Sequence, residues 1–208
     1  MAKAGLSDKK AYHHGDLKSV LLDETARILR EEGEDALSLR RLAASIGVSR
    51  TAPYHHFKDK QSLLCAVAEE GFARFNLTMK MTLEKARGKT GQEIMRDYVK
   101  AYVNFAMTNR EYYDLMYGGK VWRSDSLTRS LVTSARGTLR SNVERIQALQ
   151  DRGLIAENLD ILRFCQVSWG THHGISRLLI DGIYTDSASV KRICETAADM
   201  LWRQLAPS

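Results

Sequence analysis

The pattern of apolar positions along this chain predicts helices from one end to the other. Apolar residues recur at spacings of three and four, and the apolar-polar alternation typical of strands is absent. The 208 residues include only two prolines, which favours long helices. We therefore expect an all-α fold.

The same pattern gives the approximate extent of each helix. Glycines at Gly33, Gly47 and Gly153 end three of the segments, because glycine adopts the left-handed backbone of a helix stop. The clearest break lies at 88–91, and the helix that follows it carries Tyr98 and Tyr102 on one face. The other expected helices cover about 16–32, 39–46, 50–57, 60–86, 112–117, 126–151, 159–181 and 187–205.

Residues 38–60 carry the most informative pattern. Leu39, Leu42 and Ile46 share one helical face, and Gly47 ends that helix. Ser49 is a good N-cap for a second short helix over 50–57. Two short helices joined by a glycine turn predict a helix-turn-helix, whose second helix fits a DNA major groove.

The distribution of charge agrees with a DNA-facing surface. The net charge is only +6, but residues 36–60 hold five basic side chains against Asp59 alone, and an acidic run precedes them at 31–35. A basic segment beside an acidic one indicates a directed phosphate-facing surface. A solvated helix face is the alternative that charge alone leaves open, and the helix-turn-helix pattern favours the first reading.

The residues of this segment resemble the DNA-binding domain of TetR-family transcriptional regulators. The resemblance rests on Ser38, Leu42-Ala43, Gly47-Val48-Ser49, Tyr54, Phe57 and Lys60. Pro53 departs from the family, which usually carries an aliphatic residue there. Because proline suits the first turn of a helix, we interpret it as a tolerated variant that fixes the start of the recognition helix.

A weaker resemblance lies near the other end of the chain. Trp169, His173 and Gly174 are similar to the Trp-x-x-x-His-Gly signature of one TetR-type C-terminal domain. Trp169 and His173 are four residues apart and share a helix face, and Gly174 allows another backbone to approach closely.

Together the two resemblances imply an architecture and a function. They imply a three-helix head, joined by a fourth helix to a helical bundle that binds an effector and dimerises. We divide the chain into a flexible arm (1–15), a DNA-binding domain (16–75) and an effector-binding and dimerisation domain (76–208). The implied function is that of a ligand-responsive repressor, which binds a near-palindromic operator as a homodimer and is released by an unidentified small molecule.

Candidate site residues follow from these patterns. Arg50 can pair with guanine and Thr51 can contact a thymine methyl, whereas Tyr54 and Lys60 match phosphate contacts of the family. The predicted DNA-binding residues are Ser38, Arg50, Thr51, Tyr54, His55 and Lys60. The predicted effector-binding residues are Tyr98, Tyr102, Phe105, Tyr113, Met116, Tyr117, Trp169, His172 and His173, although aromatics at this spacing are also typical of a plain core. The predicted dimer interface comprises Ile175, Leu178, Leu179, Ile193, Ala197, Leu201 and Trp202.

Other function classes find little support in the sequence. Cys65, Cys165 and Cys194 form no metal-binding spacing, and adjacent histidines point apart on a helix, so we expect free thiols and neither metal nor cofactor. No nucleophile elbow or phosphate-binding glycine loop occurs, so we expect no enzyme. No apolar run is long enough to span a membrane, which favours a cytoplasmic protein. The alternatives left open are a binding protein or enzyme with a vestigial head, and a non-specific architectural DNA binder.

Overall fold

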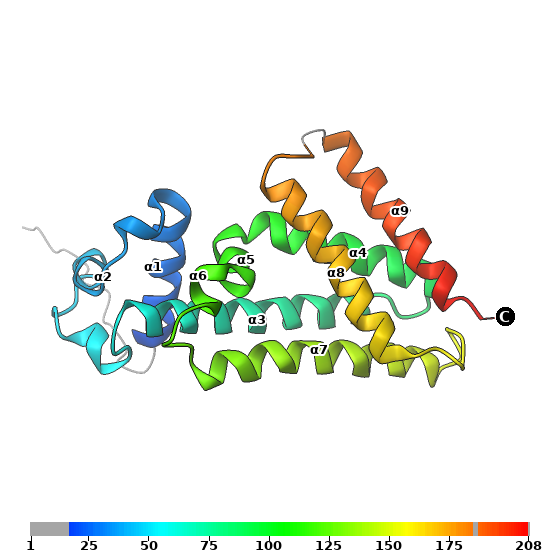
Figure 1. Cartoon of the computed structure of the whole chain (residues 1–208), viewed down its shortest axis with the longest axis horizontal. Coiled ribbons are helices and arrows are strands. Elements are labelled where there is room, and N and C mark those ends of the chain that lie inside the picture. Colours follow the sequence, from blue (N-terminus) through cyan, green and yellow to red (C-terminus); the bar gives the residue numbers. More distant parts are fainter. Residues whose placement is uncertain (1–16, 185–186, 208) are drawn as a thin grey trace, which may run out of the picture. The chain divides into compact units, whose positions relative to one another are not determined.

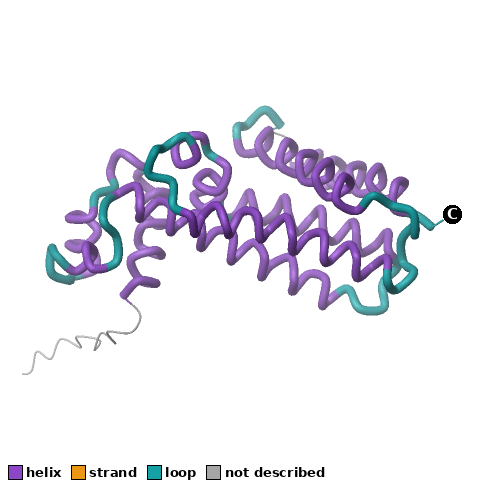
Figure 2. The backbone as a smooth tube through the Cα atoms, turned by 60° about the horizontal axis from the view of Figure 1, so that its bottom comes forward, coloured by secondary structure: helices purple, strands orange, loops and turns teal. Residues whose placement is uncertain are grey.

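Helices and turns make up the described part of the protein. The computed structural model describes residues 17–184 and 187–207, and Figure 1 shows their helices in chain order. Within these ranges no strand occurs, as the tube in Figure 2 shows. The predicted all-α fold is therefore confirmed. The arm predicted over residues 1–15 lies outside the described residues.

The observed helix bounds agree with the expected ones to within a few residues. Two short elements, η1 and α6, were not predicted. The elements are α1 (Leu17–Glu32), the 3-10 helix η1 (Glu34–Ala36), α2 (Leu39–Ile46), the 3-10 helix η2 (Ala52–His55), α3 (Lys60–Lys85), α4 (Gly91–Thr108), α5 (Arg110–Tyr117), α6 (Gly119–Trp122), α7 (Arg129–Gln150), α8 (Ile161–Ile180) and α9 (Ser187–Leu205).

The chain divides into two units, which we call the head (Met1–Lys60) and the body (Gln61–Ser208). The division falls at the first residues of α3, fifteen residues before the domain boundary expected at 75/76. The functional domain division stays a prediction.

The head builds its helix-turn-helix on a small buried core. Leu21, Leu42 and Phe57 are at most 3% exposed. Gly47 has a φ of 74°, and its N–H and that of Val48 donate to carbonyls of the last turn of α2, which ends that helix. The hydroxyl of Ser38 caps α2 by accepting from the N–H of Arg41 at 3.2 Å. The sharp turn after α2 therefore comes from local backbone geometry.

The second helix of the motif differs from the prediction. Instead of an α-helix over 50–57 capped by Ser49, a single 3-10 turn covers Ala52–His55, and Thr51 precedes it without a side-chain cap. Pro53 explains the difference, because it lacks the N–H that an α-helix would direct at the carbonyl of Ser49. The N–H of Ala52 donates to that carbonyl instead, at 3.0 Å, which is the 3-10 pattern.

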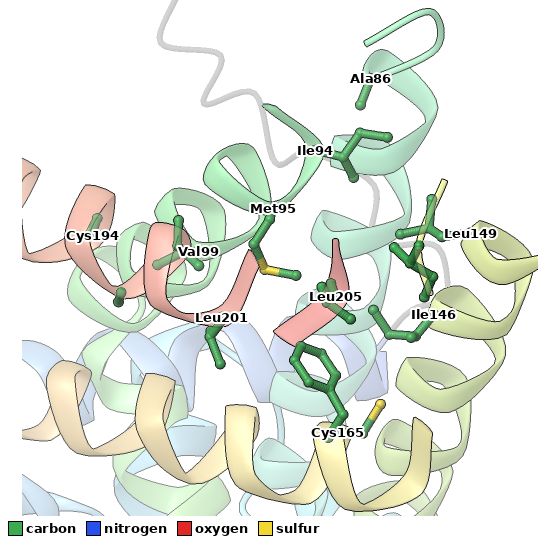
Figure 3. Packing of buried hydrophobic residues seen from close by; sticks show 14 of the residues in the cluster. Ala86, Ile94, Met95, Val99, Ile146, Leu149, Cys165, Cys194, Leu201 and Leu205 are labelled. Carbon is green, nitrogen blue, oxygen red and sulfur yellow. The ribbon is translucent and has the colours of Figure 1, made fainter. Parts of the chain in front are cut away.

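The body holds a second core, to which α4, α7, α8 and α9 contribute. In it α4 packs against α8 and α9, and α7 packs against α8. A capping box fixes the start of α4, because Thr90 and Glu93 each bond the other's backbone N–H. Figure 3 shows apolar side chains of these four helices meeting in one cluster, with the thiol of Cys165 among them.

The three cysteines are free and buried, as expected. Among the described residues, no helix has the length and apolar content needed to cross a bilayer.

Candidate nucleic-acid interface and effector site

The head exposes the side chains that the sequence predicts to contact DNA. Arg50, Thr51 and His55 are exposed, and Tyr54 is 49% exposed. Pro53 and Phe57 between and after them are buried, so the segment is anchored from below. No hydrogen bond or ion pair to another described residue occupies the guanidinium of Arg50. These four side chains are therefore accessible to a DNA groove, although the hydroxyl of Thr51 is hydrogen-bonded with that of Ser49 at 3.1 Å.

Two of the basic residues in the segment 36–60 have partners within the head. Arg41 forms an ion pair with Glu32 of α1. The ammonium of Lys60 donates to the backbone oxygen of Glu34 at 2.6 Å. Lys60 therefore joins the start of α3 to η1, and its ammonium keeps further N–H donors that can contact a phosphate. Arg40, Arg50 and Lys58 remain exposed.

The structure brings together most of the predicted effector-binding residues in the body. The indole N–H of Trp169 donates to the hydroxyl of Tyr102 at 2.9 Å and lies 3.3 Å from that of Tyr117. The hydroxyl of Tyr113 lies 2.8 Å from Nδ1 of His173. The Tyr113 and His173 rings stack, with centroids 5.6 Å apart. These residues from α4, α5 and α8 form one connected polar-aromatic cluster.

The cluster nearly fills its own space. Phe105 and Met116 are buried, and Phe105 packs edge-on against Phe75 of α3. The hollow among Tyr98, Tyr102, Trp169 and neighbouring side chains measures about 10 Å³. A larger hollow of about 270 Å³ adjoins it beside Met116 and Tyr117. Binding of an effector here therefore requires side chains to move, and the site assignment stays a prediction.

His172 lies at the centre of this region and is 2% exposed. Burial lowers the pKa of its imidazole to about 4, from an ordinary value of about 6.5. Because the neutral ring is favoured in the fold, His172 contributes stability that is present above pH 6.5 and lost as the pH falls through 4. The loss amounts to roughly 3 kcal/mol at full protonation.

We expect His172→Phe to flatten the pH dependence of stability. Urea unfolding of both proteins between pH 7 and pH 4 measures the difference in free energy of unfolding. His173 and the carboxylates titrate in both proteins, so their effect cancels in the comparison. Wild type should lose stability more steeply on acidification, because only wild type has His172. Parallel curves over this range would contradict the assignment.

The predicted dimer residues divide into two groups. Leu179, Ala197 and Leu201 are buried within the chain's own core, with Trp202 packed against that core. Ile175, Leu178 and Ile193 are half-buried. An open apolar groove of about 790 Å³ lies along α8 and α9 and includes Ile175, Ile193, Ala197 and Leu201. The interface stays a prediction, carried mainly by the residues that are not fully buried.

Some surface and interior residues escaped the sequence interpretation. Val167 and Met200 are 68% and 63% exposed and line the same groove. Asn142 and Arg145 of α7 reach the interior, and Asn142 accepts a hydrogen bond from the hydroxyl of Tyr98 at 2.8 Å. Helical spacing could have identified Asn142 and Arg145, because they lie on the same face of α7 as Ala135 and Thr138.

Two chemical alternatives have no geometry to support them. Burial raises the pKa of the Cys165 thiol to about 11, so it does not form a thiolate nucleophile near neutral pH. Gly174 has no atom within 4 Å of the position of an added Cβ, so the close approach expected there does not occur within the described chain. Between residues 17 and 207, leaving out 185 and 186, no group of three potential metal ligands gathers.

Comparison with known proteins gives the family. Residues 21–67 match the sequence model of bacterial regulatory proteins of the tetR family. An HTH-type transcriptional repressor of Mycobacterium tuberculosis is 44% identical over 54 residues, 26% of this chain and 29% of the relative. An uncharacterized HTH-type transcriptional regulator of the same species is 32% identical over 101 residues, 49% of this chain and 42% of the relative. The matches thus span less than half the length of these curated relatives.

A solved structure extends the likeness to the body. A protein with unknown function from Rhodococcus sp. RHA1 is 36% identical, with a TM-score of 0.80, over 95% of this chain and 100% of that chain. A helix-turn-helix head on an all-helical body is the architecture of one class of proteins, the helix-turn-helix regulators. The chain belongs to the TetR family of bacterial regulatory proteins.

Proposed function

We propose that this protein is a cytoplasmic, DNA-binding transcriptional repressor that acts as a homodimer and releases its operator when a small molecule binds the body. The observation that carries the proposal is the anchored helix-turn-helix, in which Arg50, Thr51, Tyr54 and His55 are exposed above buried Leu42 and Phe57. Exposed side chains on a rigid support are what base readout requires.

Each part of the proposal has its own support. The apolar groove along α8 and α9 supports a homodimer, because an isologous contact buries the same surface on both copies. A dimer would place two heads in successive major grooves, roughly 34–36 Å apart. The cluster around Trp169 supports an effector domain at 76–208, and α3 connects it covalently to the head. An effector that favours one head spacing over another would shift the population away from DNA.

The test begins by selecting fragments of the source genome that the purified protein retains. Affinity for a selected duplex and for random duplex of equal length is then measured against salt concentration. A sequence-specific repressor should keep a gap of roughly 10³-fold or more at physiological salt. Equal affinities would favour the architectural DNA binder, and absence of binding to every duplex would refute the proposal.

A further inference from the structure

One face of α7 runs past three hollows inside the body. Ala135, Thr138, Asn142 and Arg145 follow each other at spacings of three, four and three, so they share that face. Ala135 lines the outer hollow of about 270 Å³. Thr138 and Asn142 line the middle one, and Asn142 and Arg145 line the inner one, each of about 10 Å³. The row spans about 15 Å along the helix axis, at 1.5 Å per residue.

Only a few side chains separate the hollows. Trp169 is a wall of both the outer and the middle hollow. Tyr98 and Asn142 form the wall between the middle and the inner hollow, and their side chains are hydrogen-bonded at 2.8 Å. Movement of these three side chains would join the hollows into one channel. Figures 1 and 2 show α7 running beside α3. Phe72 of α3 lines the outer hollow, and Phe75 of the same helix lines the middle one.

Arg145 at the inner end is a half-buried cation that forms no ion pair with another described residue. The exposed carboxylate of Glu144, its neighbour in sequence, acts on it only through space. Its Nη2 donates to the backbone and side-chain oxygens of Asn76, at 3.3 Å and 3.2 Å. Its buried Nη1 has no hydrogen-bond partner, and among the described residues no carboxylate forms an ion pair with it. Burial also lowers the pKa of Arg145. Such a group is unfavourable unless an anion pairs with it.

The other residues that line the three hollows in the described part of the chain are apolar, aromatic or neutral polar, and none of them carries a negative charge. His172 is 2% exposed and lines the middle hollow, and its Nε2 also lacks a partner. Two buried polar groups without a hydrogen-bond partner thus lie along one row of hollows, whereas buried polar groups are normally hydrogen-bonded.

We propose that the effector is an elongated apolar monocarboxylate, whose carboxylate pairs with the guanidinium of Arg145 and whose body lies along the 135–145 face of α7. The proposal rests on the function proposed for the body. The planar fork of arginine matches a carboxylate with two parallel hydrogen bonds. Entry of the ligand swings Trp169 aside and breaks the Tyr98–Asn142 hydrogen bond, so binding changes the packing of α4, α7 and α8.

Dodecanoate is the first probe, titrated below its micelle-forming concentration into the full chain in a calorimeter, without DNA. Octanoate and hexadecanoate test the length of the channel, and dodecan-1-ol tests the need for charge. Dodecanoate should bind at least about tenfold tighter than the alcohol, since a charge-assisted hydrogen bond is lost. Equal binding of acid and alcohol, or no binding of any of the three acids, would overturn the proposal.

Variants locate the carboxylate. Arg145→Met should weaken dodecanoate binding by about 30-fold or more and leave binding of the alcohol unchanged. Arg145→Lys should retain part of the preference for the acid. Arg140→Met is the matched control, because Arg140 is an exposed arginine of the same helix. Normal dodecanoate binding by a folded Arg145→Met protein, judged by circular dichroism, would refute the assignment.

The experiment separates this inference from the proposed function. Operator binding without any carboxylate tests the repressor, whereas calorimetry without DNA tests the ligand class. A protein that binds its operator but ignores every acid keeps the first proposal and loses the second.

Discussion

Replacing Arg50 and Tyr54 together by alanine is expected to lower operator affinity by about 100-fold or more per dimer. Each head would lose two contacts, of which the base contact of Arg50 alone is worth roughly 1–3 kcal/mol, and both heads lose them at once. Arg50 and Tyr54 are exposed, so the fold has little to lose from either substitution. Fluorescence anisotropy with the selected operator duplex measures the affinity, and circular dichroism checks that the helices persist.

Arg152→Ala is the control for this experiment. Arg152 is an exposed arginine of the body, so its removal subtracts the same charge without touching the head. Its affinity and salt dependence should stay near those of wild type. If the double variant of the head binds the operator as wild type does, the recognition surface lies elsewhere.

Phe57→Ala is expected to destabilise the head by roughly 3–5 kcal/mol, because the ring is removed from a packed core. Phe57 is 3% exposed, and it directly follows the 3-10 turn that carries Tyr54. Hydrogen exchange of peptides from residues 17–57, followed by mass spectrometry, measures local opening of the head. Those amides should exchange at least about 100-fold faster, since 3 kcal/mol corresponds to slightly more than two powers of ten.

Two further variants distinguish a residue that holds the motif together from one that contacts DNA. Phe57→Leu keeps most of the buried volume and should cost less than about 1.5 kcal/mol. Tyr54→Ala should weaken operator binding while leaving exchange of the head amides unchanged. Equal protection in Phe57→Ala and wild type would show that the side chain does not hold the motif together.

The positions of the long helices could be predicted because their signals are local. Leu39, Leu42 and Ala43 give the buried face of α2, and Gly47 gives its end, with no information from elsewhere in the chain. The break at 88–91 is equally local, since Thr90 and Glu93 form the capping box within four residues. For the same reason the exposed residues of the helix-turn-helix followed from the sequence.

The type of turn in the second helix of the motif could not be predicted from the sequence pattern. The sequence identified Pro53 as a departure, but its spacing was compatible with an α-helical first turn. The structure has a 3-10 turn because the carbonyl of Ser49 accepts from Ala52 in place of the N–H that proline lacks.

The sequence by itself determined the long helices, most of their ends and the exposed positions of the helix-turn-helix. Only the tertiary structure decided that Leu179, Ala197 and Leu201 are buried within one chain, and that Arg145 faces the inner hollow without an ion pair to another described residue. The physical reason is that helical periodicity fixes which residues share a face, whereas partners of that face come from helices far apart in the sequence. A missing ion pair is a property of all those partners together.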